Sequence, residues 1–199
     1  MTFVIPLVWE NITPKNHGVH LNALYTGNVK MGKGYGESLE GLVISGGLIA
    51  AEGRVRGVRI TGGWEDTDPG NASGLSLTGL VNTCRGNTSG VRVAGGVGHT
   101  GENMYGVSVS GLVQYIGEDV KGISLSGAIT HIKEKLSGLA FGTLYTHAGE
   151  NGRFAVQIGL INHITDYNPE GTVLQIGLYS RAGDRASPLI NIRRRRKPK

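Results

Sequence analysis

Residues 105–136 read YGVSVSGLVQYIGEDV followed by KGISLSGAITHIKEKL, and these two 16-residue lines match nearly column by column. Each line opens on a glycine followed by alternating apolar and small residues, reaches a Ser-Gly pair, and closes on a polar turn that contains a glutamate. A fixed short period is the signature of a repeat architecture. We therefore base the fold prediction on the repeat rather than on local propensities.

The same line recurs along most of the chain. A looser line starts at Gly18, before the regular array, and two others start at Ala155 and Val173, after it. The sequence thus predicts about ten stacked units. The regular array is marked by opening glycines 16 or 17 residues apart, at Gly41, Gly57, Gly74, Gly90, Gly106, Gly122 and Gly138.

The residues after each opening glycine alternate in character, as Val107 and Val109 alternate with Ser108 and Ser110. This period of two is typical of β-strands. We predict an all-β parallel solenoid of about ten coils, each about 16 to 18 residues long, with the valine, isoleucine and leucine columns pointing inward. Three glycines in each line predict three corners. On this interpretation an aspartate at Val109 or Leu125 would unfold the protein, because an inward charge has no partner.

A second architecture fits the same pattern. Residues 107–115 can be read as one long strand with alternate side chains on one face. About twelve such strands would form an up-and-down β-barrel, and a barrel with its apolar face outward would be a membrane-inserted pore. Against this alternative, a glycine interrupts nearly every such strand. The aromatic content of 6% is also low for two interfacial belts.

The chain divides into three parts on this pattern. Residues 1–16 do not fit the repeat and predict an N-terminal capping segment, residues 17–183 form the repeat domain, and residues 184–199 form a C-terminal cap with a basic tail. The candidate caps themselves are residues 2–9 and 188–192. Because a solenoid exposes unpaired strand edges at its ends, incomplete capping predicts a homo-oligomer formed by end-to-end or edge association.

The positive charge of the chain is concentrated at its C-terminus. The formal net charge is +5, but the last seven residues hold six of the 20 basic side chains, which leaves 14 against 15 acidic ones in the rest of the chain. We expect this tail to bind polyanions, either nucleic acid or anionic lipid, through phosphate contacts that depend on salt. The predicted polyanion-binding residues are Arg193, Arg194, Arg195, Arg196, Lys197 and Lys199.

Other features of the sequence bear on location. The single cysteine, Cys84, excludes an internal disulfide framework. The N-terminus shows no secretory signal, because it lacks a basic segment before a short apolar run. The sequence therefore predicts a cytoplasmic protein or the processed form of a surface or outer-membrane protein.

Four histidines recur near one column of the repeat, at His99, His131, His147 and His163, with Tyr115 in the gap. In a parallel solenoid, equivalent residues of adjacent coils lie about 4.8 Å apart. His131, His147 and His163 would then form either a stacked ladder without a metal or a site for a divalent ion. We favour the ladder, because no cysteine or carboxylate shares the column. A glutamate also recurs every 16 residues in the polar turn, at Glu102, Glu118, Glu134 and Glu150.

The serine columns suggest a further alternative. If Ser108, Ser110, Ser124 and Ser126 point outward, they form a flat hydroxyl array similar to the surfaces of ice-binding proteins. The sequence contains no Ser-His-Asp order, no paired acid and base carboxylates outside the glutamate column, and no nucleotide-binding motif. We therefore predict a non-enzymatic protein without a cofactor, and we identify no small-molecule substrate.

Two late lines carry a resemblance to a known group. Residues 156–162 (VQIGLIN) and 174–180 (LQIGLYS) resemble bacterial surface-repeat proteins built of G-[LV]-Q-[IV]-G-L-x-N lines. In the regular array a serine-glycine form replaces Gln-x-Gly, and the resemblance is looser there. The resemblance implies an exported, non-enzymatic repeat protein. Together with the repeat it predicts a structural or binding scaffold that self-associates or lies at a surface.

Overall fold

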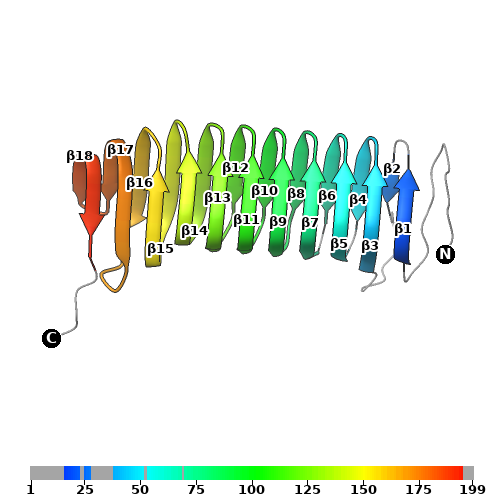
Figure 1. The fold of residues 1–199 in the computed structure, drawn as a ribbon. Helices are drawn as coiled ribbons and strands as arrows, with labels where there is room; N and C mark the ends of the chain where they lie inside the picture. The colour runs from blue at the N-terminus through cyan, green and yellow to red at the C-terminus, as the bar shows by residue number, and fades with distance from the viewer. Residues whose placement is uncertain (1–15, 23–24, 28–37, 52, 69, 195–199) are drawn as a thin grey trace.

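The computed structural model describes residues 16–22, 25–27, 38–51, 53–68 and 70–194, and in this part of the chain it contains β-strands and no helix (Figure 1). Each coil consists of two strands and two turns. In one coil β11 (Met104–Ser110) is followed by a turn at Gly111 and Leu112, then by β12 (Val113–Ile116) and a second turn at 117–119. The next coil begins with β13 (Val120–Ser126).

The longer strands stack into one sheet, which we call the long sheet. It comprises β1 (Asn16–Asn22), β3 (Ser38–Ser45), β5 (Arg54–Thr61), β7 (Ala72–Thr78), β9 (Thr88–Ala94), β11, β13, the later parts of β14 (Ile129–Gly142) and β15 (Tyr145–Ile158), and the start of β17 (Thr172–Ala182).

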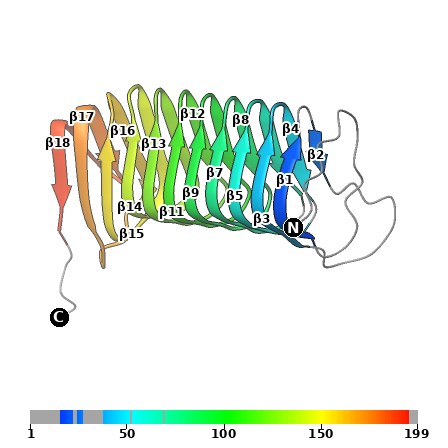
Figure 2. The ribbon, with the colours of Figure 1, turned by 45° about the vertical axis from the view of Figure 1, so that its right-hand side comes forward.

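The shorter strands stack into a second sheet, the short sheet, and the two sheets face each other along the length of the molecule (Figure 2). The short sheet comprises β2 (Tyr25–Gly27), β4 (Leu48–Ala51), β6 (Trp64–Thr67), β8 (Val81–Cys84), β10 (Val97–Thr100), β12, the first parts of β14 and β15, β16 (Ile161–Asp166) and the end of β17.

Neighbouring coils pair in parallel, with equivalent residues side by side, as Val107 pairs with Val91 on one side and Ile123 on the other. The predicted β-solenoid is confirmed, with about nine turns. The up-and-down barrel is wrong, because it requires antiparallel neighbours. The predicted three corners are two turns and a kink, since the opening glycines lie inside the strands of the long sheet.

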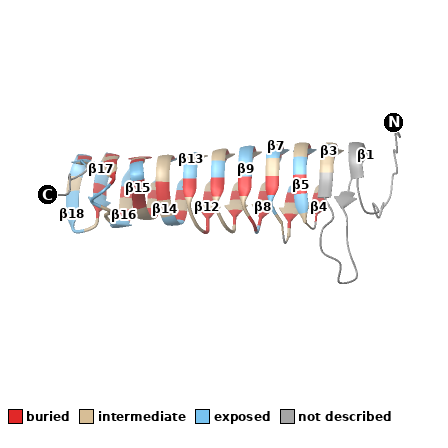
Figure 3. Cartoon of the chain, turned by 90° about the horizontal axis from the view of Figure 1, so that it is seen from below, coloured by how far each residue is buried: buried red, intermediate tan, exposed pale blue. Residues whose placement is uncertain are grey.

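The predicted direction of the side chains is wrong. Ser108, Ser110 and their equivalents are buried, while Val107 and Val109 lie on the outer surface and are only partly covered. Buried and less buried residues alternate along the strands (Figure 3). An aspartate at Val109 or Leu125 is therefore not expected to unfold the protein. The buried position of the serines also removes the flat hydroxyl array proposed for ice binding.

The prediction was wrong because an alternation of period two does not say which of its two sets of side chains points inward. A narrow coil has few inward positions, which in the β11–β12 coil are Met104, Ser108, Ser110, Gln114 and Ile116. The repeat carries more apolar columns than these positions can take, so some columns must lie outside. The interior is apolar near the 117–119 turn, at Met104, Ile116, Val120, Ile132 and Leu136, and polar near the Gly111 turn.

The opening glycines are required by their conformation and by their stacking. Gly106 has φ of 116°, and a Cβ atom added to it would lie 2.2 Å from the carbonyl oxygen of Gly90 in the preceding coil. The same relation repeats from Gly57 to Gly138. Only glycine takes this conformation without strain, which explains why the column holds glycine from Gly41 to Gly138; the next two coils have Ala155 and Val173 at this position.

We expect Gly106→Ala to destabilise the solenoid by about 2 kcal/mol or more, from the left-handed strain and the steric overlap together. Gly96→Ala provides the control. Its added Cβ would lie 2.9 Å from the Leu80 carbonyl oxygen, a milder overlap, Gly96 has no positive φ, and Leu80 and Leu112 already place side chains in that column of the turn. Urea unfolding followed by circular dichroism measures both. Equal stability of the Gly106→Ala protein and the wild type would contradict the stacking argument.

The last strand closes the C-terminal end in the opposite direction. β18 (Arg185–Arg193) pairs antiparallel with β17, and its outer edge contains Pro188 and then Leu189 with φ of 65° (Figure 1). Proline donates no hydrogen bond, and an irregular edge discourages strand addition. The candidate cap at 188–192 lies in this strand, whereas residues 2–9 lie outside the described residues.

Candidate functional site

The most extended surface feature is an apolar ridge along the edge formed by the Gly111-type turns. It consists of three strand columns and one turn column, named here by their members Val107, Val109, Val113 and Leu112. From Leu42 to Tyr179 every member of the three strand columns is apolar or aromatic. The turn column is Leu80, Leu112, Leu144, Leu160 and Leu178, with glycine or alanine in the other described coils.

The strand columns follow the pairing register. The Val107 column contains Leu42, Val58, Leu75, Val91, Val107, Ile123, Leu139, Val156 and Leu174; the Val109 column contains Ile44, Ile60, Leu77, Val93, Val109, Leu125, Phe141, Ile158 and Ile176; and the Val113 column contains Leu48, Trp64, Val81, Val97, Val113, Ile129, Tyr145, Ile161 and Tyr179.

The interior beneath this ridge is polar. The inward columns next to the Gly111-type turns hold mainly serine, threonine, asparagine and glutamine, such as Ser124, Gln157 and Gln175, all fully buried. These groups bond to one another, as when Gln175 Nε2 donates to Gln157 Oε1 at 2.7 Å and Asn191 Nδ2 donates to Gln175 Oε1 at 2.9 Å. One edge of the solenoid is therefore polar inside and apolar outside.

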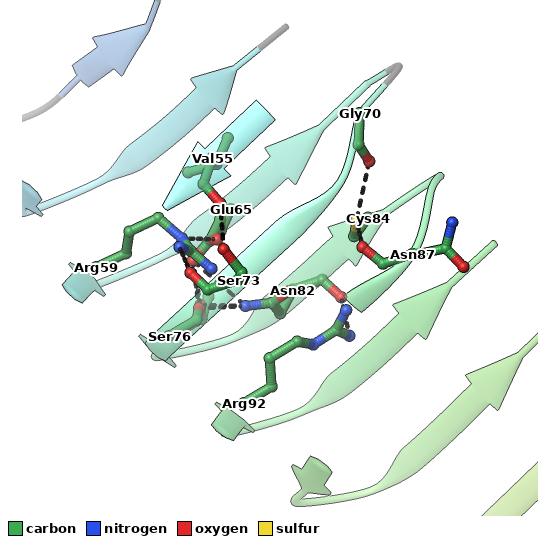
Figure 4. A network of polar contacts seen from close by, with 11 residues as sticks. Val55, Arg59, Glu65, Gly70, Ser73, Ser76, Asn82, Cys84, Asn87 and Arg92 are labelled. Carbon is green, nitrogen blue, oxygen red and sulfur yellow. Dashed lines mark hydrogen bonds and ion pairs between the residues drawn. The ribbon is translucent and has the colours of Figure 1, made fainter. Parts of the chain in front are cut away.

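A buried ion pair lies in this polar interior (Figure 4). Arg59 Nε donates to Glu65 Oε1 at 2.6 Å, and Ser76 Oγ, Thr78 Oγ1 and Asn82 Nδ2 donate to Glu65 Oε2. The network places a full complement of donors on one carboxylate. It was not predicted from the sequence, although the charged residues in a column of small residues are a visible signal.

A second buried arginine has fewer partners. Arg92 Nη2 donates to the carbonyl oxygen of His99 at 3.1 Å, whereas Arg92 Nε and Nη1 have no partner among the described residues.

Cys84, nearby on β8, is buried, and burial raises the pKa of its thiol. Its Sγ lies 3.3 Å from the carbonyl oxygen of Gly70. The thiol is therefore protonated and covered, which does not suit a nucleophile.

The histidines form a stacked column on the short sheet, beside the ridge. The ring centroids of His99 and Tyr115 lie 5.2 Å apart, those of Tyr115 and His131 5.2 Å, and those of His131 and His147 4.6 Å, with interplanar angles of 13° or less. His163 meets His147 edge-on at 5.4 Å. Parallel stacked rings do not aim their nitrogens at one point. Among the described residues no group of three histidines, cysteines or carboxylates is placed to hold a metal ion.

Burial lowers the pKa of all four histidines of this column. The positive charges of Arg92 and Arg85 lower it further at His99, against an opposing effect of Asp66, and Arg181 lowers it at His163. The neighbouring imidazoles have the same effect on His147. The rings are therefore neutral at pH 7.

This shift makes stability depend on pH. An unfolded histidine titrates near 6.5 and the folded ones titrate lower, so between these values the unfolded chain binds more protons. We expect the urea midpoint to be constant above about pH 7 and to fall as the pH drops from about 6.5 through the folded pKa values. His131→Tyr, which extends the aromatic stack from Tyr115, should flatten the profile. A midpoint that rises on acidification over this range would contradict the assignment.

The opposite edge of the solenoid is polar and charged outside. The Asn71, Asn87 and Asn103 side-chain oxygens each accept the backbone N–H 16 residues further on, and Asp119 Oδ1 continues the series. The recurring glutamates lie here. Glu102 and Glu118 accept from Asn87 and Asn103, and Glu150 accepts from Asn168 and lies 3.5 Å from Lys135 Nζ. These partners offset the like-charge stacking.

The basic tail begins inside the fold. The Arg193 guanidinium lies 3.9 Å from the ring centroid of Tyr167, and its nitrogens donate to the Ala182 carbonyl oxygen and to Asp184. A small pocket at this end is lined by Tyr167, Arg185, Ile192, Arg193 and Arg194. The predicted tail residues Arg195, Arg196, Lys197 and Lys199 lie outside the described residues.

Comparison of the chain with protein-family models, with curated proteins and with solved structures finds no match. In the described part of the chain, no helix is long and apolar enough to cross a membrane. The surfaces of the solenoid itself therefore carry the information about function.

Proposed function

We propose that the protein is a non-enzymatic repeat scaffold that acts by attaching its apolar ridge to a second apolar surface. The observation that carries this proposal is the inverted edge, with three uniformly apolar columns outside and a buried polar network inside. Contiguous apolar patches of this kind mark interaction sites. The solenoid repeats the same surface in every coil, as a scaffold does.

Two further observations support the proposal. The reactive groups in the interior are engaged or covered, since Glu65 is bound by Arg59 and by three further donors and Cys84 is a buried thiol. The resemblance of residues 156–162 and 174–180 to bacterial surface-repeat proteins also favours a role at a surface.

The proposal is tested by making the ridge polar without changing its shape. The ridge variant replaces Leu80, Leu112, Leu144 and Leu178 by glutamine, all at positions more than half exposed. The edge variant, as control, replaces the exposed Lys133, Glu134 and Glu170 of the opposite edge by glutamine. We expect the wild type and the edge variant to bind detergent micelles or to self-associate, and the ridge variant to do neither.

Analytical ultracentrifugation with and without a non-ionic detergent measures both properties. A wild type that stays monomeric and free of detergent, with no difference from the ridge variant, would overturn the proposed function. Circular dichroism of the three proteins checks that the substitutions leave the solenoid folded.

A second candidate function, polyanion binding by the tail, is favoured by the grouping of Arg185, Arg193 and Arg194 around one pocket. Its test compares the full chain with one that ends at Arg194, because Arg193 is bonded into the fold. The candidate requires that DNA binding depends on the last five residues and falls steeply with salt. Equal binding by both chains would exclude the tail as the binding element.

A further inference from the structure

We propose that the apolar ridge lies in the outer part of a phospholipid bilayer, with the solenoid axis parallel to the membrane plane. This inference rests on the proposed function and names the partner of the ridge. It is argued from the shape of the ridge, from its dimensions and from the side chains at its borders.

The ridge is convex. Its crest is the turn column, where Leu80, Leu112 and Leu178 are 63%, 59% and 65% exposed, and its flanks are the outer faces of the long sheet and the short sheet. Exposure is lower over most of both flanks, as at Leu77 on the long sheet and Ile129 on the short sheet. Trp64 on a flank (50%) is nonetheless more exposed than Leu160 on the crest (44%). A second rigid copy would cover one flank of such an edge and leave the other exposed. A fluid acyl layer covers the crest and both flanks together.

The dimensions fit partial immersion. Adjacent coils lie about 4.8 Å apart, so the eight steps from Leu42 to Leu174 give a ridge about 40 Å long. The Val109 column and the ring column of Tyr115 each lie three residues from Leu112, which corresponds to a depth of about 10 Å along a strand. The Val107 column lies about 16 Å from the crest and stays above this depth. Amphipathic segments that lie in a membrane interface bury their apolar faces to about 5–10 Å.

The borders of the ridge carry the side chains that suit a membrane interface. On the short sheet the neutral His99–His163 stack and Tyr115 lie next to the Val113 column, which itself contains Trp64 and Tyr179. Aromatic rings with one polar position concentrate at membrane–water boundaries.

On the long sheet, the column beyond the Val107 column holds charges of both signs. Lys121 Nζ lies 5.4 Å from the ring centroid of Tyr105, and Glu40 and Arg56 are neighbours in the same column. The glutamates Glu102, Glu118 and Glu134 lie at the opposite edge, away from the headgroups. The charges on this flank are therefore mixed and lie nearer the opposite edge than the crest, so the contact with the bilayer is apolar.

The test uses flotation of the full chain with vesicles of phosphatidylcholine alone and of phosphatidylcholine with phosphatidylglycerol, at low salt and at about 0.5 M salt. We expect binding to both vesicles that is insensitive to salt, because the contact is apolar. The ridge variant should bind at least roughly a hundredfold more weakly, since each of its four substitutions removes a leucine from the acyl layer. The edge variant should bind as the wild type does.

A second readout needs no change in the ridge. In a Trp9→Phe background, Trp64 is the only tryptophan of the chain and lies half-exposed on the ridge. Vesicles with brominated acyl chains should quench its fluorescence, and the emission should shift to the blue. Unchanged fluorescence in vesicles that do bind the protein would overturn the proposed orientation.

The outcomes separate this inference from the proposed function. Binding only to phosphatidylglycerol vesicles, lost at high salt and lost on removal of residues 195–199, would assign membrane binding to the tail and overturn the inference. Self-association that the ridge variant abolishes, without flotation of the wild type, would make a second copy the partner; the inference would fail and the proposed function would stand. If the wild type neither self-associates nor floats with vesicles, both the proposed function and this inference are overturned.

Discussion

Replacing Ile132 by aspartate should abolish folding, whereas the same replacement at Ile123 should leave the solenoid intact. Ile132 is fully buried in the apolar half of the interior, while Ile123 is 38% exposed on the outer face of the long sheet. A carboxylate at Ile132 would have no charged partner, and burying it costs about 5 kcal/mol or more. This cost is comparable to the whole free energy of unfolding of a domain. At Ile123 we expect a change within about 1 kcal/mol.

The two isoleucines lie nine residues apart in consecutive strands, so residue type and local sequence are matched. Thermal unfolding followed by circular dichroism distinguishes the outcomes. A folded Ile132→Asp protein with a normal midpoint, or an unfolded Ile123→Asp protein, would contradict the assignment of inside and outside.

The second large effect concerns the buried ion pair. Glu65→Gln should destabilise the protein by about 3 to 5 kcal/mol, because it leaves the charge of Arg59 buried without a counter-charge. Arg59 is 1% exposed, and its one other bond to a described residue runs from Nη1 to the carbonyl oxygen of Ser73 at 3.1 Å. The double variant Arg59→Met, Glu65→Gln removes both charges and should recover most of this loss.

A double-mutant cycle in urea isolates the coupling. The account requires that the double variant is more stable than Glu65→Gln alone. If the losses in unfolding free energy of the two single variants instead add in the double variant, groups other than Glu65 stabilise the buried charge of Arg59.

Much of the architecture could be predicted from the sequence. The spacing of the opening glycines gave the coil length and the parallel register, because a strict period forces equivalent residues to stack. The histidine column followed from the same register. The conformation of Gly106, at φ of 116°, explains why the period is marked by glycine.

The direction of the side chains could not be predicted by the same reasoning. Placing apolar residues inside is the usual rule, and it assigned Val109 and Leu125 to the core. The sequence does carry a signal against this assignment, because it has more apolar columns than a narrow coil has inward positions. Met104, Ile116 and Val120 already fill the apolar part of the interior. The inward positions on both sides of Gly106, from Met104 to Ile116, belong to one alternation, and a period of two does not reveal which of its two sets of side chains points inward.

The buried network was missed for a related reason. Arg59 and Glu65 are six residues apart on two strands of one coil, and only the turn between them brings their side chains together. Spacing along the chain does not encode that contact. The ridge could be recognised only once the serine columns were placed inside.

The inverted edge is tested most directly by the accessibility of consecutive positions in one strand. In a Cys84→Ser background, single cysteines at Ile123, Ser124 and Ser126 can be labelled with a water-soluble maleimide under native conditions. The structure predicts rapid labelling at position 123 and protection at 124 and 126, whose serines are 0% and 3% exposed. Rapid labelling at 124 and 126 with protection at 123 would place the apolar columns inside and contradict the account.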